Sequence, residues 1–355
     1  MVESHRLPVA EVVAETADAV TVVFAVPPAL TERYAYRPGQ FLTLRIPADE
    51  GGLARCYSLS SSPHPANPGQ RIAVTVKRVA DGRGSNWLCD HAAPGLELDT
   101  LPPAGTFTPR SLDTDLLLVA AGSGITPVMS ILRTALATGT GRLTLCYANE
   151  HERSVIFADQ LRRLTAAHPD RLSVVHWLTS LQGLPTSAGL AALLAPYADR
   201  EVFLCGPAAF MAAVTHGLRE LSVPRARIHI ERFASLTEDP FGPADQTTPP
   251  TTPPTTSPTG PAETAAASVE VLLDGARHRL GWPADTVLLD ALRANGLAAP
   301  HSCREGACGA CAVRVTSGEV RMRRNEVLDQ TDLAEGYALA CQALPVTESV
   351  SVSYE

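Results

Sequence analysis

The sequence predicts a multidomain protein: an antiparallel β-barrel, a parallel α/β domain and a small α+β domain. Three observations support this. Short β-prone runs separated by turn-forming residues occupy the chain up to about residue 110. Strand and helix patterns alternate from Asp115 onward, which is typical of a parallel sheet. Residues 243–261 contain seven prolines and almost nothing apolar, so they separate the third domain from the first two.

Length and charge narrow the classes of function. A chain of 355 residues exceeds one ordinary core, and 45% apolar with 19% charged residues is typical of a soluble globular protein. The net charge of −8 argues against nucleic acid or an anionic membrane as partner and is compatible with docking on a basic protein surface. No apolar run approaches the roughly 20 residues of a membrane span, and residues 1–10 lack a signal-peptide core. We expect a cytoplasmic location, where cysteines serve as thiols or metal ligands.

The barrel is expected from β-prone runs, and the parallel domain from buried strands that alternate with helices. The barrel runs are 9–15, 20–26, 41–46 and 72–79. The later strands are predicted at 116–120, 143–148, 174–178, 201–205 and 228–230, with helices at 127–137 and 155–165. The predicted boundaries are 1–111 for the barrel, 112–236 for the α/β domain, 237–267 for a Pro/Thr-rich linker and 268–355 for the third domain.

The third domain begins with a β-hairpin. Residues 269–273 are followed by Asp274-Gly275, a pair typical of a tight hairpin turn, and then by residues 276–280. A helix is predicted at 286–295 and is ended by Gly296. The proline-rich linker is expected to be extended, because it cannot bury enough surface to fold. It would act as a tether that lets the third domain move between two partners.

Four cysteines in the third domain have a metal-ligand spacing. Cys303 is followed by four residues, Cys308, two residues and Cys311, and Cys341 follows after 29 more. This is the spacing of plant-type [2Fe–2S] sites. Small residues between the first three cysteines let backbone N–H groups approach the sulfur atoms. The alternative, a zinc site, more often has two C-x2-C pairs. The remaining cysteines, without ligand spacing, are Cys56, Cys89, Cys146 and Cys205.

Two motifs in the barrel carry groups suited to a flavin nucleotide. In RCYSL, Arg55 can pair with a phosphate, Tyr57 can stack on a ring and Ser58 can reach the flavin N5 atom. Gly82, Gly84 and Ser85 precede an apparent helix, whose free N–H groups can bind a pyrophosphate. The alternatives are a strand with an exposed arginine for the first motif and a glycine-rich hairpin for the second.

The α/β domain carries a second nucleotide pattern. AAGSGITP follows a buried strand and begins a helix, so Gly122 and Gly124 can bring backbone close to a pyrophosphate. Thr126 and Pro127 occupy the first helical turn, where proline's missing N–H costs nothing. Cys205 ends a later strand, directly before Gly206 and Pro207, and these three residues are further candidates for the nucleotide site. The alternative interpretation of Cys205 is a buried thiol before a turn.

The charged residues that follow the second strand of this domain indicate which nicotinamide cofactor is preferred. Glu150 and Glu152 would repel a 2′-phosphate, and Arg153 would attract one. We therefore predict a preference for NADH over NADPH.

RCYSL, GRGSNWL, AAGSGITP and CGP, in this order and spacing, resemble the ferredoxin–NADP reductase superfamily. With a C-terminal ferredoxin module, which implies a β-grasp fold, the chain is similar to the reductase components of multicomponent oxygenases. The stretches RCYSLSSSP, GSNWLCD, LDTLPPAGTF, VVHWL and CREGACGAC most resemble the reductases of 3-ketosteroid-9-alpha-hydroxylases. Phenylacetyl-CoA oxygenase reductases share this layout.

The resemblance implies roles for individual residues. FAD, or FMN as in phthalate-dioxygenase-type reductases, would contact Arg55, Tyr57, Ser58, Lys77, Gly84, Ser85 and Asn86. The nicotinamide would lie beside Cys205, Gly206 and Pro207, with Glu231 and Phe233 near the flavin ring. The implied reaction is hydride transfer from NADH to the flavin, followed by single-electron transfer through the cluster to a terminal oxygenase, expected to be of the Rieske type. The protein is expected to be monomeric. The alternatives are the reductase of another oxygenase and a redox-sensing protein.

Overall fold

The computed structural model describes residues 4–48, 52–63, 71–236, 240–241, 267–328 and 330–354. They fall into two compact units, which are described separately here: residues 4–233, and the chain from Ala234 onward. The predicted linker lies outside the described residues except for Pro240, Phe241 and Ala267.

The first domain is a closed antiparallel barrel of six strands. They are β1 (His5–Thr16), β2 (Ala19–Ala25), β3 (Phe41–Ile46), β4 (Leu53–Ser58), β5 (Arg71–Lys77) and β6 (Glu97–Ala104), with α1 (Arg83–His91) between the last two. The strand order is β4-β3-β6-β1-β2-β5. A bridge between Leu59 and Val74 joins the two edges. Alternating side chains fill the interior with a core that includes Leu7, Val22 and Phe24.

The sequence runs predicted four of these six strands. β4 and β6 were not predicted as strands, and β6 contains Pro102 and Pro103, which normally disfavour one. Gly84 and Ser85 were expected to precede a helix. They lie inside α1, which begins at Arg83 with Gly82 at its N-cap position.

The second domain is a five-stranded parallel sheet with the order β11-β10-β7-β8-β9. Its elements are β7 (Leu116–Ala121), α2 (Ile125–Thr138), β8 (Leu143–Asn149), α3 (Ala158–Ala167), β9 (Leu172–Leu178), α4 (Thr179–Gln182), α5 (Ser187–Leu194), β10 (Glu201–Cys205), α6 (Ala208–Glu220) and β11 (Ile228–Glu231). Single 3-10 turns lie in this domain at η2 (Gly122–Gly124), η3 (Glu152–Ser154), η4 (Ala195–Tyr197) and η5 (Arg225–Arg227), and in the barrel at η1 (Pro28–Leu30). From β7 the chain adds β8 and β9 on one side of the sheet, and then β10 and β11 on the other side. In parallel sheets, ligands bind beyond the carboxyl ends of the strands at the point where the strand order changes side, which here lies between β7 and β10.

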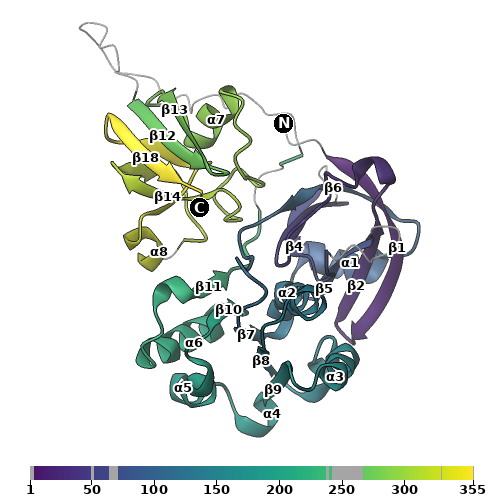
Figure 1. Ribbon diagram of the computed structural model, residues 1–355. Helices are drawn as coiled ribbons and strands as arrows, with labels where there is room; N and C mark the ends of the chain where they lie inside the picture. Colours follow the sequence, from purple (N-terminus) through teal and green to yellow (C-terminus); the bar gives the residue numbers. More distant parts are fainter. Residues whose placement is uncertain are drawn as a thin grey trace, which may run out of the picture. The chain divides into compact units, whose positions relative to one another are not determined.

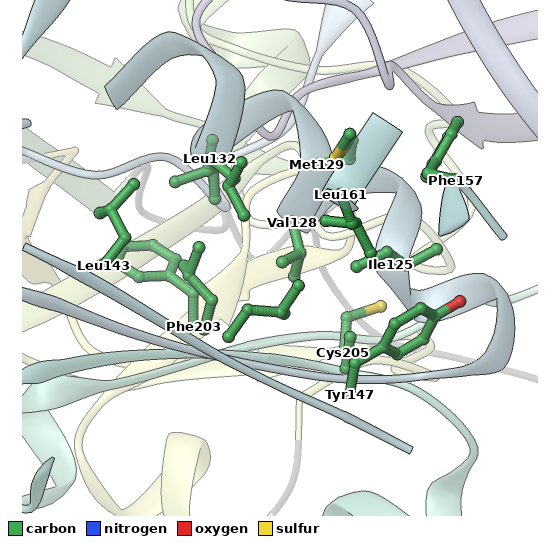
Figure 2. Close-up of a cluster of buried hydrophobic side chains, with 14 of the residues drawn as sticks. Ile125, Val128, Met129, Leu132, Leu143, Tyr147, Phe157, Leu161, Phe203 and Cys205 are labelled. Carbon is green, nitrogen blue, oxygen red and sulfur yellow. The ribbon is translucent and has the colours of Figure 1, made fainter. Parts of the chain in front are cut away.

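Helices cover both faces of this sheet (Figure 1), with α2 and α3 on one and α5 and α6 on the other. Figure 2 shows the core beneath α2, where Val128, Met129 and Leu132 lie among side chains of the strands and of α3. Cys205 and Tyr147 belong to the same buried cluster. The core thus fixes α2 directly against the carboxyl ends of β7 and β10.

The predicted helix at 155–165 begins late in the structure. Residue Phe157, buried in the core, adopts a left-handed backbone with φ of 64°. An α-helix cannot pass through that conformation, so α3 begins at Ala158.

The second unit is a β-grasp domain. Its elements are β12 (Ala267–Leu273), β13 (Ala276–Trp282), α7 (Leu288–Ala294), β14 (Ala312–Ser317), β15 (Val320–Met322), α8 (Gln330–Ala334), β16 (Tyr337–Leu339), β17 (Ala343–Pro345) and β18 (Ser349–Ser353). The main sheet has the order β13-β12-β18-β14-β16, with β12 and β18 parallel. The predicted hairpin turn is present, since Asp274 and Gly275 both have positive φ. The helix predicted at 286–295 is shorter, starting at Leu288.

Within the described residues, no helix is long and apolar enough to span a membrane.

Candidate functional site

The end of β4 meets the amino end of α1. A Cβ added at Gly84 would lie 3.0 Å from Cγ of Arg55 and 3.1 Å from Oη of Tyr57. The two predicted flavin motifs are therefore in contact, with a helix amino end beside an arginine and an aromatic ring. Burial raises the pKa of Tyr57, so its hydroxyl stays neutral. Ser58 is buried at the last position of β4.

The other predicted flavin residues surround this contact in different ways. Ser85 and Asn86 are tied to the preceding turn: the Ser85 hydroxyl accepts from the Val79 N–H, and the Asn86 amide donates to the Val79 carbonyl oxygen. Lys77, at the end of β5, forms an ion pair with Asp18, with Nζ 3.4 Å from Oδ2. The turn keeps the amino end of α1 in place, and the ammonium group of Lys77 already has a partner.

The two predicted nicotinamide motifs meet at the carboxyl ends of β7 and β10. A Cβ added at Gly124 would lie 2.2 Å from the carbonyl oxygen of Cys205 and 2.7 Å from the amide nitrogen of Gly206. Only glycine allows this approach. Pro127 lies in the first turn of α2, and the hydroxyl of Thr126 donates to the carbonyl oxygen of Ser123 at 3.0 Å.

Cys205 and Glu231 lie side by side in register at the ends of β10 and β11. Burial, reinforced by the neighbouring Glu231, raises the pKa of the Cys205 thiol well above its usual value. Glu231 is half-buried, and the loss of solvent around its carboxyl raises the pKa of that group to about 8. At neutral pH both groups carry their protons. Phe233, which follows β11, has 53% of its surface exposed.

The predicted specificity residues follow β8, the strand next to β7. Glu150, Glu152 and Arg153 are all exposed there. The turn is fixed by His151 and Ser154, which hydrogen-bond to each other in both directions. These charged side chains therefore face solvent beside the carboxyl end of β8, and their role in cofactor preference stays a prediction.

The four cysteines with ligand spacing come together in the second unit as two pairs. Cys303 hydrogen-bonds with Cys308, and Cys311 with Cys341. No three His, Cys, Asp or Glu side chains of the described residues group closely enough to hold a single metal ion. Two pairs suit a two-iron cluster, in which each iron takes two of the four protein ligands.

Backbone N–H groups also point at these sulfur atoms. The Cys308 thiol and the N–H groups of Glu305, Ala307 and Cys308 lower the pKa of the Cys303 thiol to about 7, against the opposing effect of burial. Cys341 receives a backbone N–H from Gly306 and a side-chain N–H from Gln342. Such donors stabilise thiolate charge, so the loop fits an anionic iron–sulfur group.

Sequence reasoning missed a polar seam between the barrel and α2. Arg133 donates to the carbonyl oxygen of Ser60 at 2.7 Å, and the Ser130 hydroxyl donates to that of Ser61 at 2.6 Å. The seam joins the chain directly after β4 to the helix that starts at the glycine turn. The sequence feature that could have revealed this seam is a set of polar residues on one face of a largely apolar helix, at i, i+3 and i+4: Ser130, Arg133 and Thr134.

Comparison with known proteins identifies the domains. Three domain families match successive parts of the chain: an oxidoreductase FAD-binding domain over 6–108, an oxidoreductase NAD-binding domain over 118–216 and a 2Fe-2S iron-sulfur cluster binding domain over 271–346. The chain is 54% identical to the ferredoxin reductase component of 3-ketosteroid-9-alpha-monooxygenase from Mycolicibacterium smegmatis, covering 99% of this chain and 97% of that protein. The chain belongs to this reductase family.

Other members and relatives agree over the full length. The corresponding reductase component of Rhodococcus rhodochrous is 53% identical, covering 98% of this chain and 96% of that protein. A component of the 1,2-phenylacetyl-CoA epoxidase of Escherichia coli (strain K12) is 35% identical, covering 100% of this chain and 99% of that protein. The predictions of FAD, NADH and [2Fe–2S] as cofactors are confirmed for the family's domains, whereas the assignment of single residues to them stays a prediction.

Solved structures share the three-domain fold. Full-length CYP116B46 from Tepidiphilus thermophilus matches with a TM-score of 0.64 and 26% identity, over 98% of this chain and 42% of that longer chain. Phthalate dioxygenase reductase matches with a TM-score of 0.56 and 23% identity, over 99% and 98%. The predicted order of barrel, parallel sheet and ferredoxin domain is confirmed.

Proposed function

We propose that this chain is the reductase component of a 3-ketosteroid 9-alpha-hydroxylating monooxygenase whose terminal oxygenase is of the Rieske type. The observation that carries the proposal is full-length similarity, at 52–54% identity, to four such reductase components. The bound groups supply hydride transfer from NADH to FAD and single-electron transfer through [2Fe–2S]. A cytoplasmic, monomeric protein is part of the proposal.

Within this proposal, the barrel residues bind and orient the flavin. Arg55 and the amino end of α1 supply positive charge for its phosphates, and Tyr57 supplies a ring face. Gly82, Gly84, Ser85 and Asn86 shape that helix end. Ser58 holds a hydroxyl at the end of β4. Lys77 acts through its pair with Asp18, since its ammonium is held there.

The α/β domain positions the dinucleotide. Gly122, Gly124, Thr126 and Pro127 present the amino end of α2 to the pyrophosphate. Gly206 and Pro207 form the turn against which the nicotinamide lies. The protonated Cys205 and Glu231 keep negative charge away from this turn at neutral pH, and Phe233 supplies an exposed ring beside it. No residue is required as a general acid or base, because the chemistry belongs to the cofactors.

In the second unit, Cys303 and Cys308 would ligate one iron and Cys311 and Cys341 the other. The backbone N–H groups of the loop would stabilise the cluster's charge, and burial of three of the four sulfurs limits access of water.

The test has two stages. NADH should reduce the bound flavin rapidly in stopped-flow measurements, and the protein should reduce ferricyanide or cytochrome c with catalytic turnover. With a Rieske-type steroid oxygenase component, it should then support 9-alpha-hydroxylation of a 3-ketosteroid. A single stoichiometric reduction without turnover would favour the redox-sensing alternative instead.

Similarity to the 1,2-phenylacetyl-CoA epoxidase component supports one second candidate, the reductase of an aromatic acyl-CoA oxygenase. Parallel assays with the epoxidase's oxygenase component distinguish the two. Faster product formation with that component than with the steroid oxygenase would overturn the steroid assignment and leave the reductase class intact.

A further inference from the structure

A carboxylate is buried inside the cysteine loop of the ferredoxin domain. Glu305 lies between Cys303 and Cys308, and its side chain is fully inaccessible to water. A buried carboxylate is costly unless a cation and hydrogen bonds compensate for the lost solvation. The carboxylate of Glu305 is also unfavourable in this loop because the loop is the proposed binding site of an anionic cluster, which would repel it.

Arg324 provides the compensating charge. Its Nη1 lies 3.3 Å from Oε2 of Glu305, and its Nη2 lies 2.5 Å from Oε1 of Glu326. The two carboxylates differ in their surroundings: Glu305 is fully buried, whereas the side chain of Glu326 is 40% exposed. Arg324 thus pairs with one carboxylate that is fully buried and with a second that is partly exposed to solvent.

The backbone on which Arg324 sits is fixed against the cysteine loop. The N–H of Glu326 donates to the carbonyl oxygen of Gly306 at 3.1 Å, and the N–H of Arg323 donates to that of Gln342 at 3.0 Å. A Cβ added at Gly306 would lie 2.8 Å from the carbonyl oxygen of Arg324. The guanidinium is therefore held close to the loop by backbone contacts that do not depend on Glu305.

We propose that Glu305 and Arg324 form a charge pair beside the [2Fe–2S] site in which each charge offsets the effect of the other on the reduction potential. Reduction adds one electron to an already anionic cluster, so a buried negative charge beside it opposes reduction and a positive charge favours it. The fully buried charge of Glu305 is weakly screened by solvent and salt, whereas that of Arg324 is partly exposed. The inference rests on the proposed function of the four cysteines as cluster ligands.

The test is a redox titration of the purified full-length protein, following the electron paramagnetic resonance signal of the reduced cluster at pH 8. Glu305→Gln should raise the midpoint potential. Arg324→Met should lower it, and the double variant should lie close to wild type because the two opposite charges leave together. Opposite signs with cancellation are not expected from general loosening of the loop, which would move all three variants in one direction.

Glu326→Gln is the matched control, because it removes a carboxylate from the same arginine at an exposed position. It should shift the potential by less than half as much as Glu305→Gln, and 0.5 M salt should diminish its shift further while leaving that of Glu305→Gln nearly unchanged. Equal shifts for the two glutamates, or shifts of the same sign for Glu305→Gln and Arg324→Met, would overturn the proposal.

Cluster content, measured as iron and sulfide per chain, identifies variants that have lost the cluster and whose potentials therefore cannot be compared. If Arg324→Met cannot retain the cluster, Arg324→Lys keeps the charge and should restore both cluster content and a near-wild-type potential. Restored content with a potential far from wild type would contradict the charge pair. A wild-type protein with no [2Fe–2S] signal would instead overturn the proposed function, so the two failures are distinct.

Discussion

Cys205 and Cys303 are both buried thiols, yet their surroundings shift their pKa values in opposite directions. Cys205, at the end of β10, lies in an apolar core beside a carboxyl group, and its pKa is raised. Cys303 is as inaccessible, but a second thiol and three backbone N–H groups point at its sulfur and lower its pKa to about 7. Directed N–H groups and a neighbouring thiol, and not exposure, therefore distinguish the surroundings of Cys303 from those of Cys205.

The strongest challenge to this contrast is removal of each sulfur in turn. Cys303→Ser should abolish the [2Fe–2S] cluster, because a serine hydroxyl is a poor substitute for the thiolate ligand. Cys205→Ser should leave the cluster intact. Iron content and visible absorption of the two variants check this. A Cys303→Ser protein with full iron content would remove Cys303 from the ligand set.

The next largest effect is expected where Cys205 meets the glycine turn. Gly124→Ala places a Cβ 2.2 Å from the carbonyl oxygen of Cys205, so either α2 or β10 must move. We expect flavin reduction by NADH to slow about 100-fold, since small misplacements of reacting groups are that costly. FAD content should not change. Stopped-flow kinetics measure the rate, and a variant within twofold of wild type would contradict the expected displacement.

A smaller effect is expected at the glycine beside the cysteine loop. Gly306 has φ of 78°, and alanine there costs about 1–2 kcal/mol of backbone strain. The added Cβ also approaches Arg324 and Gln342. Gly306→Ala should lose its cluster about tenfold faster than wild type on incubation with a chelator, as followed by visible absorption. Unchanged loss kinetics would show that the loop adapts without strain.

The last prediction concerns the pH dependence of stability contributed by Glu231, which helps to raise the pKa of Cys205. The carboxyl has a pKa of about 8 in the folded protein and an ordinary value near 4.5 when unfolded. Below the lower value both states are protonated and the full stability is present; as pH rises toward 8 only the unfolded chain loses its proton, so the folded state loses stability.

Glu231→Gln removes that pH dependence. Between pH 5 and 8.5 the wild type should lose about 2 kcal/mol more free energy of unfolding than the variant, after allowance for partial exposure of the carboxyl. Urea unfolding at a series of pH values measures the difference. Parallel pH curves for the two proteins would mean that Glu231 titrates normally.

The sequence predicted the parts of this structure that depend on local pattern. The strand–glycine–helix motif from Ala120 to Pro127 and the cysteine spacing arise from neighbouring residues, so the sequence displays them. The contacts between motifs depend on the tertiary fold. Gly124 meets Cys205 because β10 lies beside β7, and no local pattern of either motif contains that pairing.

Charge partners were the hardest to anticipate. Glu305 pairs with a residue 19 positions away and Arg133 with a carbonyl oxygen 73 positions away. Such pairs depend on which loops the sheet brings together. β6 was missed for a different reason, because Pro102 and Pro103 concealed a strand that tertiary packing stabilises.

The ion pair of Lys77 with Asp18 has a practical consequence, since Lys77 is the only lysine of the chain. An amine-acylating reagent can modify one side chain, apart from the N-terminus, and its rate reports how firmly that one ammonium is held. Amine-directed cross-linking would therefore map almost nothing of a complex with another protein, whereas carboxyl-directed reagents have 37 acidic side chains to address.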